Sequence, residues 1–286
     1  NILAFLIAKL RGKPVVLTQH ISMVPYKSVC LRLTMRTAYA IFGRLLLGYS
    51  DQVVFYSKEV YSDFRKRYRI NSGPTFIANG VDIARFAPAA PDERSRLRQE
   101  LFALSDESPV FLFVGRFVEK KGLPVIRQLA RALPDIPFVM LGEGPLQPES
   151  WSLTNVQVHR GLDNAAVAQY YKAADLMILP SIGEGLPLVM QEAMSTGLPV
   201  IVSSRTANAD PVATQCVFHE PCLDELDEDE VVARWTRRLR ELADDPVARN
   251  AHVEQLRETV LQHWTWEVCA GRYAEVMDSL LRGDPN

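Results

Sequence analysis

Two acidic residues stand eight positions apart in the segment 184–200, EGLPLVMQEAMSTGLPV. Glu184 precedes a predicted helix, and Glu192 lies about a turn and a half inside that helix. Pro187 suits the first helical position because its missing N–H would have no partner there, and Gly197 suits the helix end. A carboxylate beside a positive helix N-terminus, with a second one further along, favours a ligand that carries both phosphate and hydroxyl groups.

A cationic pair follows the apolar run FLFV, which predicts a buried strand. Gly115 and Arg116 come directly after this run, and Lys121 comes five residues later, beside Gly122, at a predicted helix start. An arginine fork can grip two phosphate oxygens, and a lysine adds a compact point charge. The pair therefore suits a phosphate pocket, and ordinary surface charge is the alternative for this motif alone.

Three further glycines follow predicted strands. Gly142 and Gly144 belong to the sequence LGEGP, and Gly161 follows VQVHR. Because glycine has no side chain, it lets a ligand approach the backbone closely. Each of these glycines taken alone is equally consistent with a plain turn, so they support a site only together with the charged residues.

Strands and helices alternate along the chain. Strands are predicted at 14–19, 52–56, 74–77, 109–114, 138–141, 156–159, 176–179 and 198–202. Helices are predicted at 26–48, 58–68 (capped by Ser57), 92–103, 123–132, 164–172, 187–196, 228–244, 246–260 and 264–282. This alternation predicts parallel sheets covered on both faces, which bind ligands at the carboxyl ends of their strands. The segment 84–93, rich in proline and alanine, is predicted to be a linker.

The composition, 48% hydrophobic and 23% charged, is typical of a globular protein. The apolar run at residues 1–10 is too short to span a bilayer and lacks the features of a signal peptide. It predicts a truncated helix, so we expect the chain to be a fragment. The four cysteines have no metal-type CxxC spacing, and we expect them to be reduced thiols in the cytosol.

Charge is unevenly distributed along the sequence. The first 80 residues hold twelve lysines and arginines but three acids, a net charge of +9, so the rest of the chain carries −11 of the total of −2. The basic part is interleaved with leucine, phenylalanine, tyrosine and methionine, which favours contact with an anionic membrane surface. A solvated basic helix face is the alternative. No recognised nucleic-acid-binding motif accompanies the charge, and we expect no nucleic-acid partner.

Taken together, the motifs resemble those of retaining glycosyltransferases of the GT-B fold, in particular glycosyltransferase family 4. The matching stretches are, in order, VVLTQH, SDQVVFYSKEV, FIANGVDIARFAP, FLFVGRFVEKKG, MLGEGP, YYKAADLMILPSIGEGLPLVMQEAMSTGLPVIV and WTWEVCAGRYAEVM. The resemblance covers nearly the whole chain and is most specific over residues 174–202. It implies an α/β fold with two Rossmann-like parallel-sheet domains facing a cleft, the first of them incomplete. The implied domains are an acceptor-side domain at 1–86, a donor-binding domain at 87–262 and a returning helix at 263–286.

The resemblance also implies roles for the charged residues. Arg116 and Lys121 would hold the donor diphosphate and stabilise the departing nucleotide. Glu192 would accept hydrogen bonds from the ribose hydroxyls, and Glu184 would contact the transferred sugar. The physical chemistry agrees, because fixed cations lower the barrier to breaking a sugar–phosphate bond.

Backbone groups and one histidine complete the implied donor site. The backbone of Gly185 and Leu186 would face the sugar or the phosphates, and groups near the glycines after the strands would recognise the base. These glycines are Gly115, Gly142, Gly144 and Gly161. His20, at the end of its predicted strand, resembles a family histidine that reaches the donor sugar from the first domain, although a lone histidine there is more commonly structural.

The activity implied is that of a metal-independent, retaining hexosyltransferase without a cofactor. Its donor would be a nucleotide-diphosphate sugar and its acceptor a lipid-linked, polysaccharide or small-molecule one. The leaving phosphate would guide the acceptor onto the same face, so we assign no carboxylate nucleophile. The acids at 227–229 have D-x-D spacing but fit an acidic helix start better than a metal site. We expect Trp264 and Trp266 to be packing residues of the tail helix.

Some features depart from the family pattern. The segment 203–216 lacks the usual paired-glycine turn, and several family elements would precede Asn1, so we expect this chain alone to be inactive. The basic first part predicts a cytoplasmic protein that is peripheral on the inner face of the membrane. Two other functions stay open: a sugar-nucleotide epimerase of the same fold, and a non-catalytic nucleotide-sugar binding module.

Overall fold

The computed structural model describes residues 2–19, 33–34, 37–103 and 108–283. The chain divides into two compact units, residues 1–80 with 266–286 and residues 81–265. His20, Cys30 and much of the helix predicted at 26–48 lie outside the described residues. None of the described helices is long and apolar enough to cross a bilayer.

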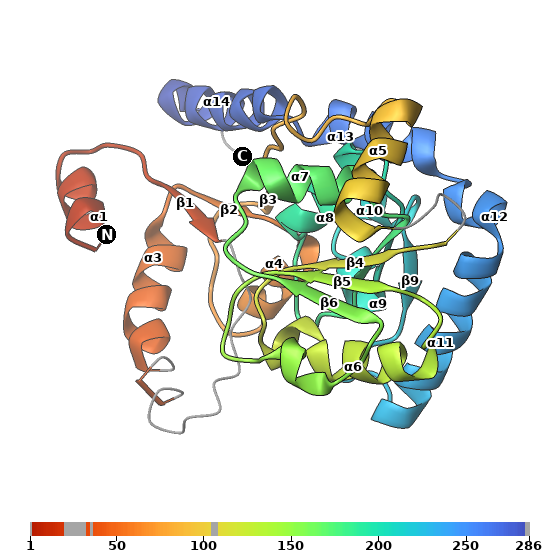
Figure 1. Cartoon of the computed structure of the whole chain (residues 1–286). Helices are drawn as coiled ribbons and strands as arrows, with labels where there is room; N and C mark the ends of the chain where they lie inside the picture. The colour runs from red at the N-terminus through yellow and green to blue at the C-terminus, as the bar shows by residue number, and fades with distance from the viewer. Residues whose placement is uncertain (1, 20–32, 35–36, 104–107, 284–286) are drawn as a thin grey trace. The chain divides into compact units, whose positions relative to one another are not determined.

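The unit at residues 81–265 contains a sheet in which all neighbouring strands pair in parallel (Figure 1). The strands are β4 (Phe111–Val114), β5 (Phe138–Leu141), β6 (Val156–His159), β7 (Leu176–Leu179), β8 (Val200–Ser203) and β9 (Phe218–Glu220). Their spatial order is β6-β5-β4-β7-β8-β9. The chain therefore starts at the centre with β4, winds outward to β6, and returns to the centre with β7. This is the doubly wound arrangement that the alternation of strands and helices predicted.

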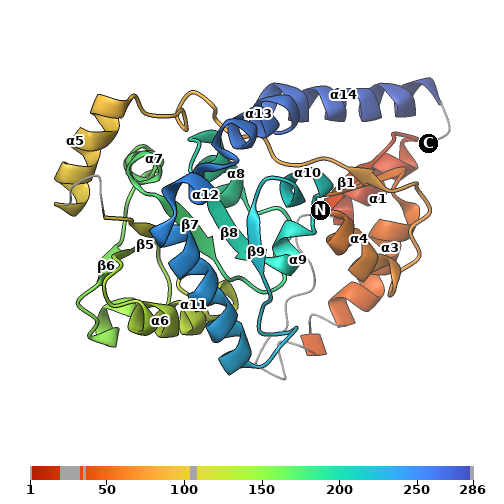
Figure 2. The ribbon, with the colours of Figure 1, turned by 90° about the vertical axis from the view of Figure 1, so that its right-hand side faces the viewer.

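Helices cover both faces of this sheet. The helices α7 (Asn164–Ala173) and α8 (Leu188–Ser195) lie on one face, and α6 (Leu123–Ala132) and α11 (Glu228–Asp244) lie on the other (Figures 1 and 2). Every residue of β4, β5, β7 and β8 is buried. The strands are continuous apolar runs because both faces of a doubly wound sheet are covered. The remaining helical segments of the unit are α5 (Pro91–Phe102), η2 (Glu119–Lys121), η3 (Pro148–Trp151), α9 (Ser204–Ala207), α10 (Pro211–Thr214), α12 (Pro246–Asn250) and α13 (Val253–His263).

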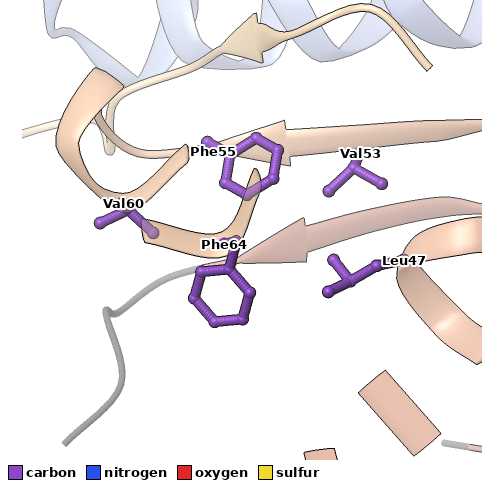
Figure 3. Close-up of a cluster of buried hydrophobic side chains, with 5 residues drawn as sticks. All are labelled: Leu47, Val53, Phe55, Val60 and Phe64. Carbon is purple, nitrogen blue, oxygen red and sulfur yellow. The ribbon is translucent and has the colours of Figure 1, made fainter. Parts of the chain in front are cut away.

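The other unit has its own parallel sheet, in the order β1-β2-β3. Side chains of β2 alternate between its two faces, as strand geometry requires. On one face Val53 and Phe55 join the cluster drawn in Figure 3, whose members are Leu47, Val53, Phe55, Val60 and Phe64. On the other face Val54 packs with Ile77 and with Cys269 of α14. The elements of this unit are α1 (Ile2–Leu10), β1 (Val16–Gln19), η1 (Tyr39–Gly43), α3 (Arg44–Tyr49), β2 (Gln52–Phe55), α4 (Lys58–Arg65), β3 (Thr75–Phe76) and α14 (Trp266–Arg282).

Three capping predictions are confirmed. Ser57 caps α4, where its hydroxyl accepts a hydrogen bond from the N–H of Val60 at 3.2 Å. Asp227 caps α11 and accepts from Glu230 N at 3.0 Å, so the D-x-D spacing marks a helix start, as expected. Gly197 ends α8 with a φ of +77°, a conformation that favours glycine.

Other local predictions were wrong. Pro187 is the cap before α8 and not its first residue. The helix predicted at 246–260 is two helices, because the chain turns at 251–252 and the ring of His252 packs on Phe218, with ring centroids 6.0 Å apart. Trp264 is buried as expected, but Trp266 is 54% exposed at the start of α14.

Candidate active site at the switch point of the second sheet

The strands β4 and β7 are neighbours at the centre of the sheet, and the chain winds away from them in opposite directions. Loops that leave the carboxyl ends of two such strands diverge, and the crevice between them is where doubly wound sheets bind ligands. The loop after β4 carries Arg116 and Lys121, and the loop after β7 carries Glu184. The topology therefore brings the predicted phosphate-binding cations and the predicted sugar-binding acid to one edge of the sheet.

Backbone contacts fix these two loops to each other. Ile182 N donates to Lys120 O at 2.9 Å, which joins the β7 loop to the β4 loop. Ser203 Oγ, at the end of β8, donates to Ser181 O at 2.7 Å and holds the β7 loop from its other side. Gly122 has a φ of +78°, and a Cβ there would collide with the carbonyl of Pro180. Close backbone packing at the site is thus possible because residue 122 has no side chain.

A second approach of backbones links the β4 and β5 loops. Gly115 N donates to Leu141 O at 3.0 Å, and Phe117 N donates to Glu143 O at 2.7 Å. A Cβ on Gly142 would collide with the carbonyl of Gly115, so this glycine is required by packing between the two loops. At Gly161, after β6, a Cβ would meet nothing within 4 Å.

The central feature of the site is an ion pair between the two loops. Lys121 Nζ lies 3.1 Å from Glu184 Oε2, and Lys120 Nζ lies 3.6 Å from Glu184 Oε1. The Glu184 side chain is 14% exposed and that of Lys121 is 16% exposed. Glu184 Oε1 has no hydrogen-bond partner among the described residues. A ligand hydroxyl at Glu184 and a ligand phosphate at Lys121 would therefore lie next to each other.

Glu192 occupies a more buried position within α8. Tyr171 Oη donates to Glu192 Oε2 at 3.1 Å. Burial raises the pKa of Glu192 to about 7, although the Tyr171 hydrogen bond and the positive charge of Arg85 act in the opposite direction. Near neutral pH this group therefore exchanges between a carboxyl and a carboxylate. A ligand that donates two hydroxyl hydrogen bonds would favour the carboxylate.

The roles of the remaining predicted site residues stay predictions, and the structure gives their positions. Arg116 is exposed directly after β4. Gly185 and Leu186 lie in the loop before α8, where Leu186 is buried. Gly144, like Gly142, lies in the loop after β5.

Three residues that act on the two acids were not predicted from the sequence: Tyr171, Lys120 and Arg85. The repeated tyrosine of YYKAAD, at helical spacing before β7, was the available signal for Tyr171.

Replacing Glu192 by glutamine is expected to raise stability and to weaken donor binding. Its pKa of about 7, against an ordinary value of 4.5, means that the folded protein holds this proton more tightly than the unfolded chain. Its contribution to the free energy of unfolding is therefore full below pH 4.5 and is lost as pH rises through 7. Above pH 8, Glu192→Gln should unfold at a free energy about 2–3 kcal/mol higher than the wild type.

The same substitution should weaken nucleotide binding about tenfold or more, because a charge-assisted hydrogen bond becomes a neutral one. Urea unfolding at pH 5 and pH 8, with calorimetric titration of nucleotide, checks both effects. Glu258→Gln on the exposed face of α13 is the control and should change neither quantity. If the free energy of unfolding of Glu192→Gln depended on pH as it does in the wild type, the raised pKa of Glu192 would be contradicted.

One group of possible metal ligands occurs within the part of the chain that the structure describes, in the loop after β9: Cys222, Asp224 and Glu225. Its members already bind one another and their neighbours. The Cys222 thiol donates to Asp224 Oδ1 at 2.6 Å, Asp224 pairs with Arg205, and Glu225 accepts from Ser204. Burial, and then Glu225, raise the pKa of Cys222 to about 12. Because these ligand atoms already have protein partners, we assign no metal here.

The chain is similar to glycosyltransferases of known sequence and structure. Residues 96–217 match the family model described as glycosyl transferases group 1. The chain is 28% identical over 249 residues to a GDP-mannose-dependent monoacylated alpha-(1-6)-phosphatidylinositol monomannoside mannosyltransferase of Corynebacterium glutamicum, covering 80% of this chain and 62% of the relative. It is 32% identical over 179 residues to a UDP-Gal:alpha-D-GlcNAc-diphosphoundecaprenol alpha-1,3-galactosyltransferase of Escherichia coli, covering 58% of this chain and 43% of the relative.

Solved structures agree on the fold. The structure of Anabaena HepE in complex with UDP-glucose has a TM-score of 0.76 at 17% identity, and the match covers 97% of this chain and 76% of that one. The fold is thus that of the GT-B glycosyltransferases, and residues 96–217 match the model of the group 1 family. It spans less than two thirds of the length of the curated relatives above.

Proposed function

We propose that the complete protein is a retaining glycosyltransferase that moves a sugar from a nucleotide-diphosphate donor to a lipid-linked, saccharide or small-molecule acceptor. The observation that carries this proposal is the contact between Lys121 and Glu184 at the switch point of a group 1 glycosyltransferase sheet. In this proposal Lys121 would bind the diphosphate, and Glu184, in contact with it, would bind the sugar hydroxyls.

The proposed chemistry needs no metal ion. Breaking the sugar–phosphate bond leaves negative charge on the nucleotide diphosphate, and Arg116 and Lys121 would stabilise that charge. Glu184 would accept hydrogen bonds from the sugar and favour the positive charge that develops on its ring. The departing phosphate would receive the proton of the acceptor hydroxyl on the same face, which gives retention without a carboxylate nucleophile.

The names of the relatives support an acceptor bound to a lipid. The C. glutamicum relative is named for a phosphatidylinositol monomannoside and the E. coli relative for a diphosphoundecaprenol. We propose a lipid-linked acceptor for this protein as well, in the synthesis of a cell-envelope glycan or glycolipid.

The test of the function uses the full-length protein and measures turnover of UDP-, GDP- and ADP-sugars with and without a lipid-linked acceptor. Release of the nucleoside diphosphate together with a glycosylated acceptor of unchanged anomeric configuration supports the proposal, and unchanged turnover in EDTA supports the absence of a metal. Conversion of the donor sugar to its epimer would instead show an epimerase. Binding without turnover of any donor would show a non-catalytic module.

We also propose that the basic part of the chain, residues 1–80, contacts an anionic membrane surface. Leu3, Leu6, Ile7 and Leu10 of α1 are exposed, and Arg11 and Lys13 follow the helix. Apolar residues next to basic ones suit the boundary between headgroups and acyl chains.

Sedimentation with phosphatidylglycerol vesicles is expected to capture the protein at low salt and to release it at high salt. The double substitution Arg11→Glu with Lys13→Glu should lower the partition coefficient at least about 30-fold, because the loss of each basic charge costs about 1 kcal/mol. Lys58→Glu, a single charge reversal at an exposed position of α4, serves as the control and should lower binding much less. Equal binding to vesicles of pure phosphatidylcholine would contradict the electrostatic part of the proposal.

A further inference from the structure

A cavity of about 750 Å³ lies at the opposite end of the second sheet from the switch-point crevice. Its walls include Asp175 and Pro199, which immediately precede β7 and β8, so it is at the amino ends of these strands. The rest of the wall comes from α5 and the segment before it, the end of α7, the turn after α8, the end of α11 and the segment from α12 to α13. We call it the amino-end cavity. The residues assigned to the transfer reaction do not line it, apart from Tyr171, whose hydroxyl group binds Glu192.

Positive charge predominates around this cavity. Arg94, Arg249 and Arg257 line it, together with Asp175 and the exposed Glu254. Lys172 also lines it but is paired with a carboxylate, that of Glu93, at 2.8 Å.

The buried carboxylate of Asp175 cannot balance the arginines near it. Arg94 and Arg98 each approach it to 2.7 Å, and Arg249 lies 3.8 Å away. Val110 N donates to it as well, at 2.8 Å. One carboxylate therefore faces three guanidinium groups. Isolated charges removed from water are costly unless they are paired.

Arg249 has a buried guanidinium group whose hydrogen bonds are incompletely satisfied within the described part of the chain. Its side chain is 8% exposed, and its Nε has no hydrogen-bond partner within the described part of the chain. One terminal nitrogen of the guanidinium donates to the carbonyl of Leu242 at 2.8 Å, which fixes the group in place. Burial lowers the pKa of Arg249 and Asp175 raises it, while the neighbouring Arg94 and Arg98 lower it further against a smaller opposite effect of Asp245. An anion in the cavity would remove this repulsion.

Arg257 and the start of α13 supply two further features that suit an anion. Arg257 donates to the backbone carbonyl of Phe86 at 3.3 Å and to that of Ser195. These acceptors are neutral, so the charge of Arg257 is not balanced by them. Val253 begins α13 and lines the cavity, and its cap, His252, makes no side-chain capping hydrogen bond. A helix N-terminus of this kind favours negative charge.

We propose that the amino-end cavity binds a multivalent oxyanion, the phosphate group of a small phosphorylated molecule, through Arg94, Arg249 and Arg257. The guanidinium forks match the oxygens of a phosphate, and the cavity has room for an organic group beyond it. This site is separate from the donor crevice, since it lies at the other end of the same strands.

The experiment measures binding of inorganic phosphate and pyrophosphate to the full-length protein by calorimetry and thermal unfolding. The background carries Arg116→Ala and Lys121→Ala, so that anions at the donor crevice do not contribute. Binding is expected to persist in this background and to raise the unfolding temperature. Absence of binding there would overturn the proposal.

The substitution Arg94→Gln should lower the affinity for pyrophosphate at least tenfold. Arg96→Gln is the matched control, because Arg96 lies on the same helix, is exposed and pairs with Glu100. Equal affinities in these two variants would overturn the proposal. Arg249→Gln is a second probe: even where its own stability is lower, its unfolding temperature should no longer rise with pyrophosphate, and a rise equal to that of the background would count against the site.

Discussion

Replacing Lys121 by alanine is expected to lower kcat/KM for sugar transfer by about 10²–10³-fold, the range found when a donor that stabilises transition-state charge is removed. The ammonium group of Lys121 is mostly buried beside Glu184, at the edge of the sheet where the donor diphosphate is proposed to lie. The charge that it faces grows as the sugar–phosphate bond breaks, so the loss should fall mainly on kcat. Steady-state assays over a range of donor concentrations separate the two constants.

Lys120 provides the matched control. It also pairs with Glu184, but at 3.6 Å, with a side chain that is 38% exposed and therefore better screened by water. Lys120→Ala should lower kcat/KM less than about tenfold, as removal of an exposed partner allows. Equal losses in the two variants would mean that the general charge of the loop matters and not the position of Lys121. Arg116→Ala should reduce kcat in the same direction as Lys121→Ala.

The unit at residues 81–265 shows how much of such a site can be predicted from the sequence. The strands β5, β6 and β7 and the helix α6 have the predicted bounds, because continuous apolar runs and helical spacing are local signals. The strand order is not local. Lys121 and Glu184 meet because β4 and β7 are neighbours, and only the family resemblance gave a reason to connect them.

What could not be predicted depends on packing between distant segments. The raised pKa of Glu192 follows from burial beside Tyr171, and the sequence shows neither the burial nor the partner. The cluster around Asp175 joins α5, the turn before β7 and α12, and each of its arginines looks like ordinary surface charge in the sequence. The exposure of Trp266 is of the same kind, since a tryptophan at a helix start gives no local sign of its environment.

Gly122→Ala is expected to destabilise the protein far more than Gly161→Ala. The two glycines have similar backbones, with φ of +78° and +68°, so the strain of a left-handed alanine, about 1–2 kcal/mol, is common to both. At residue 161 a Cβ meets nothing within 4 Å, whereas at residue 122 it collides with the carbonyl of Pro180. Overpacking of this kind adds about 1–3 kcal/mol, so the free energy of unfolding should fall by about 2–5 kcal/mol for Gly122→Ala.

The collision at residue 122 should also reach the site. Gly122 follows Lys121 directly, and Pro180 begins the loop that carries Glu184, so any movement that makes room for a Cβ separates the two loops. Under conditions where both variants are fully folded, kcat/KM should fall about tenfold or more for Gly122→Ala, because small displacements of catalytic groups are costly. Gly161→Ala should stay within about twofold, the size of an ordinary surface change. Urea unfolding followed by donor turnover below the transition measures both quantities. If Gly122→Ala lost stability but kept its turnover, the packing of the two loops would support the fold without setting the distance between Lys121 and Glu184.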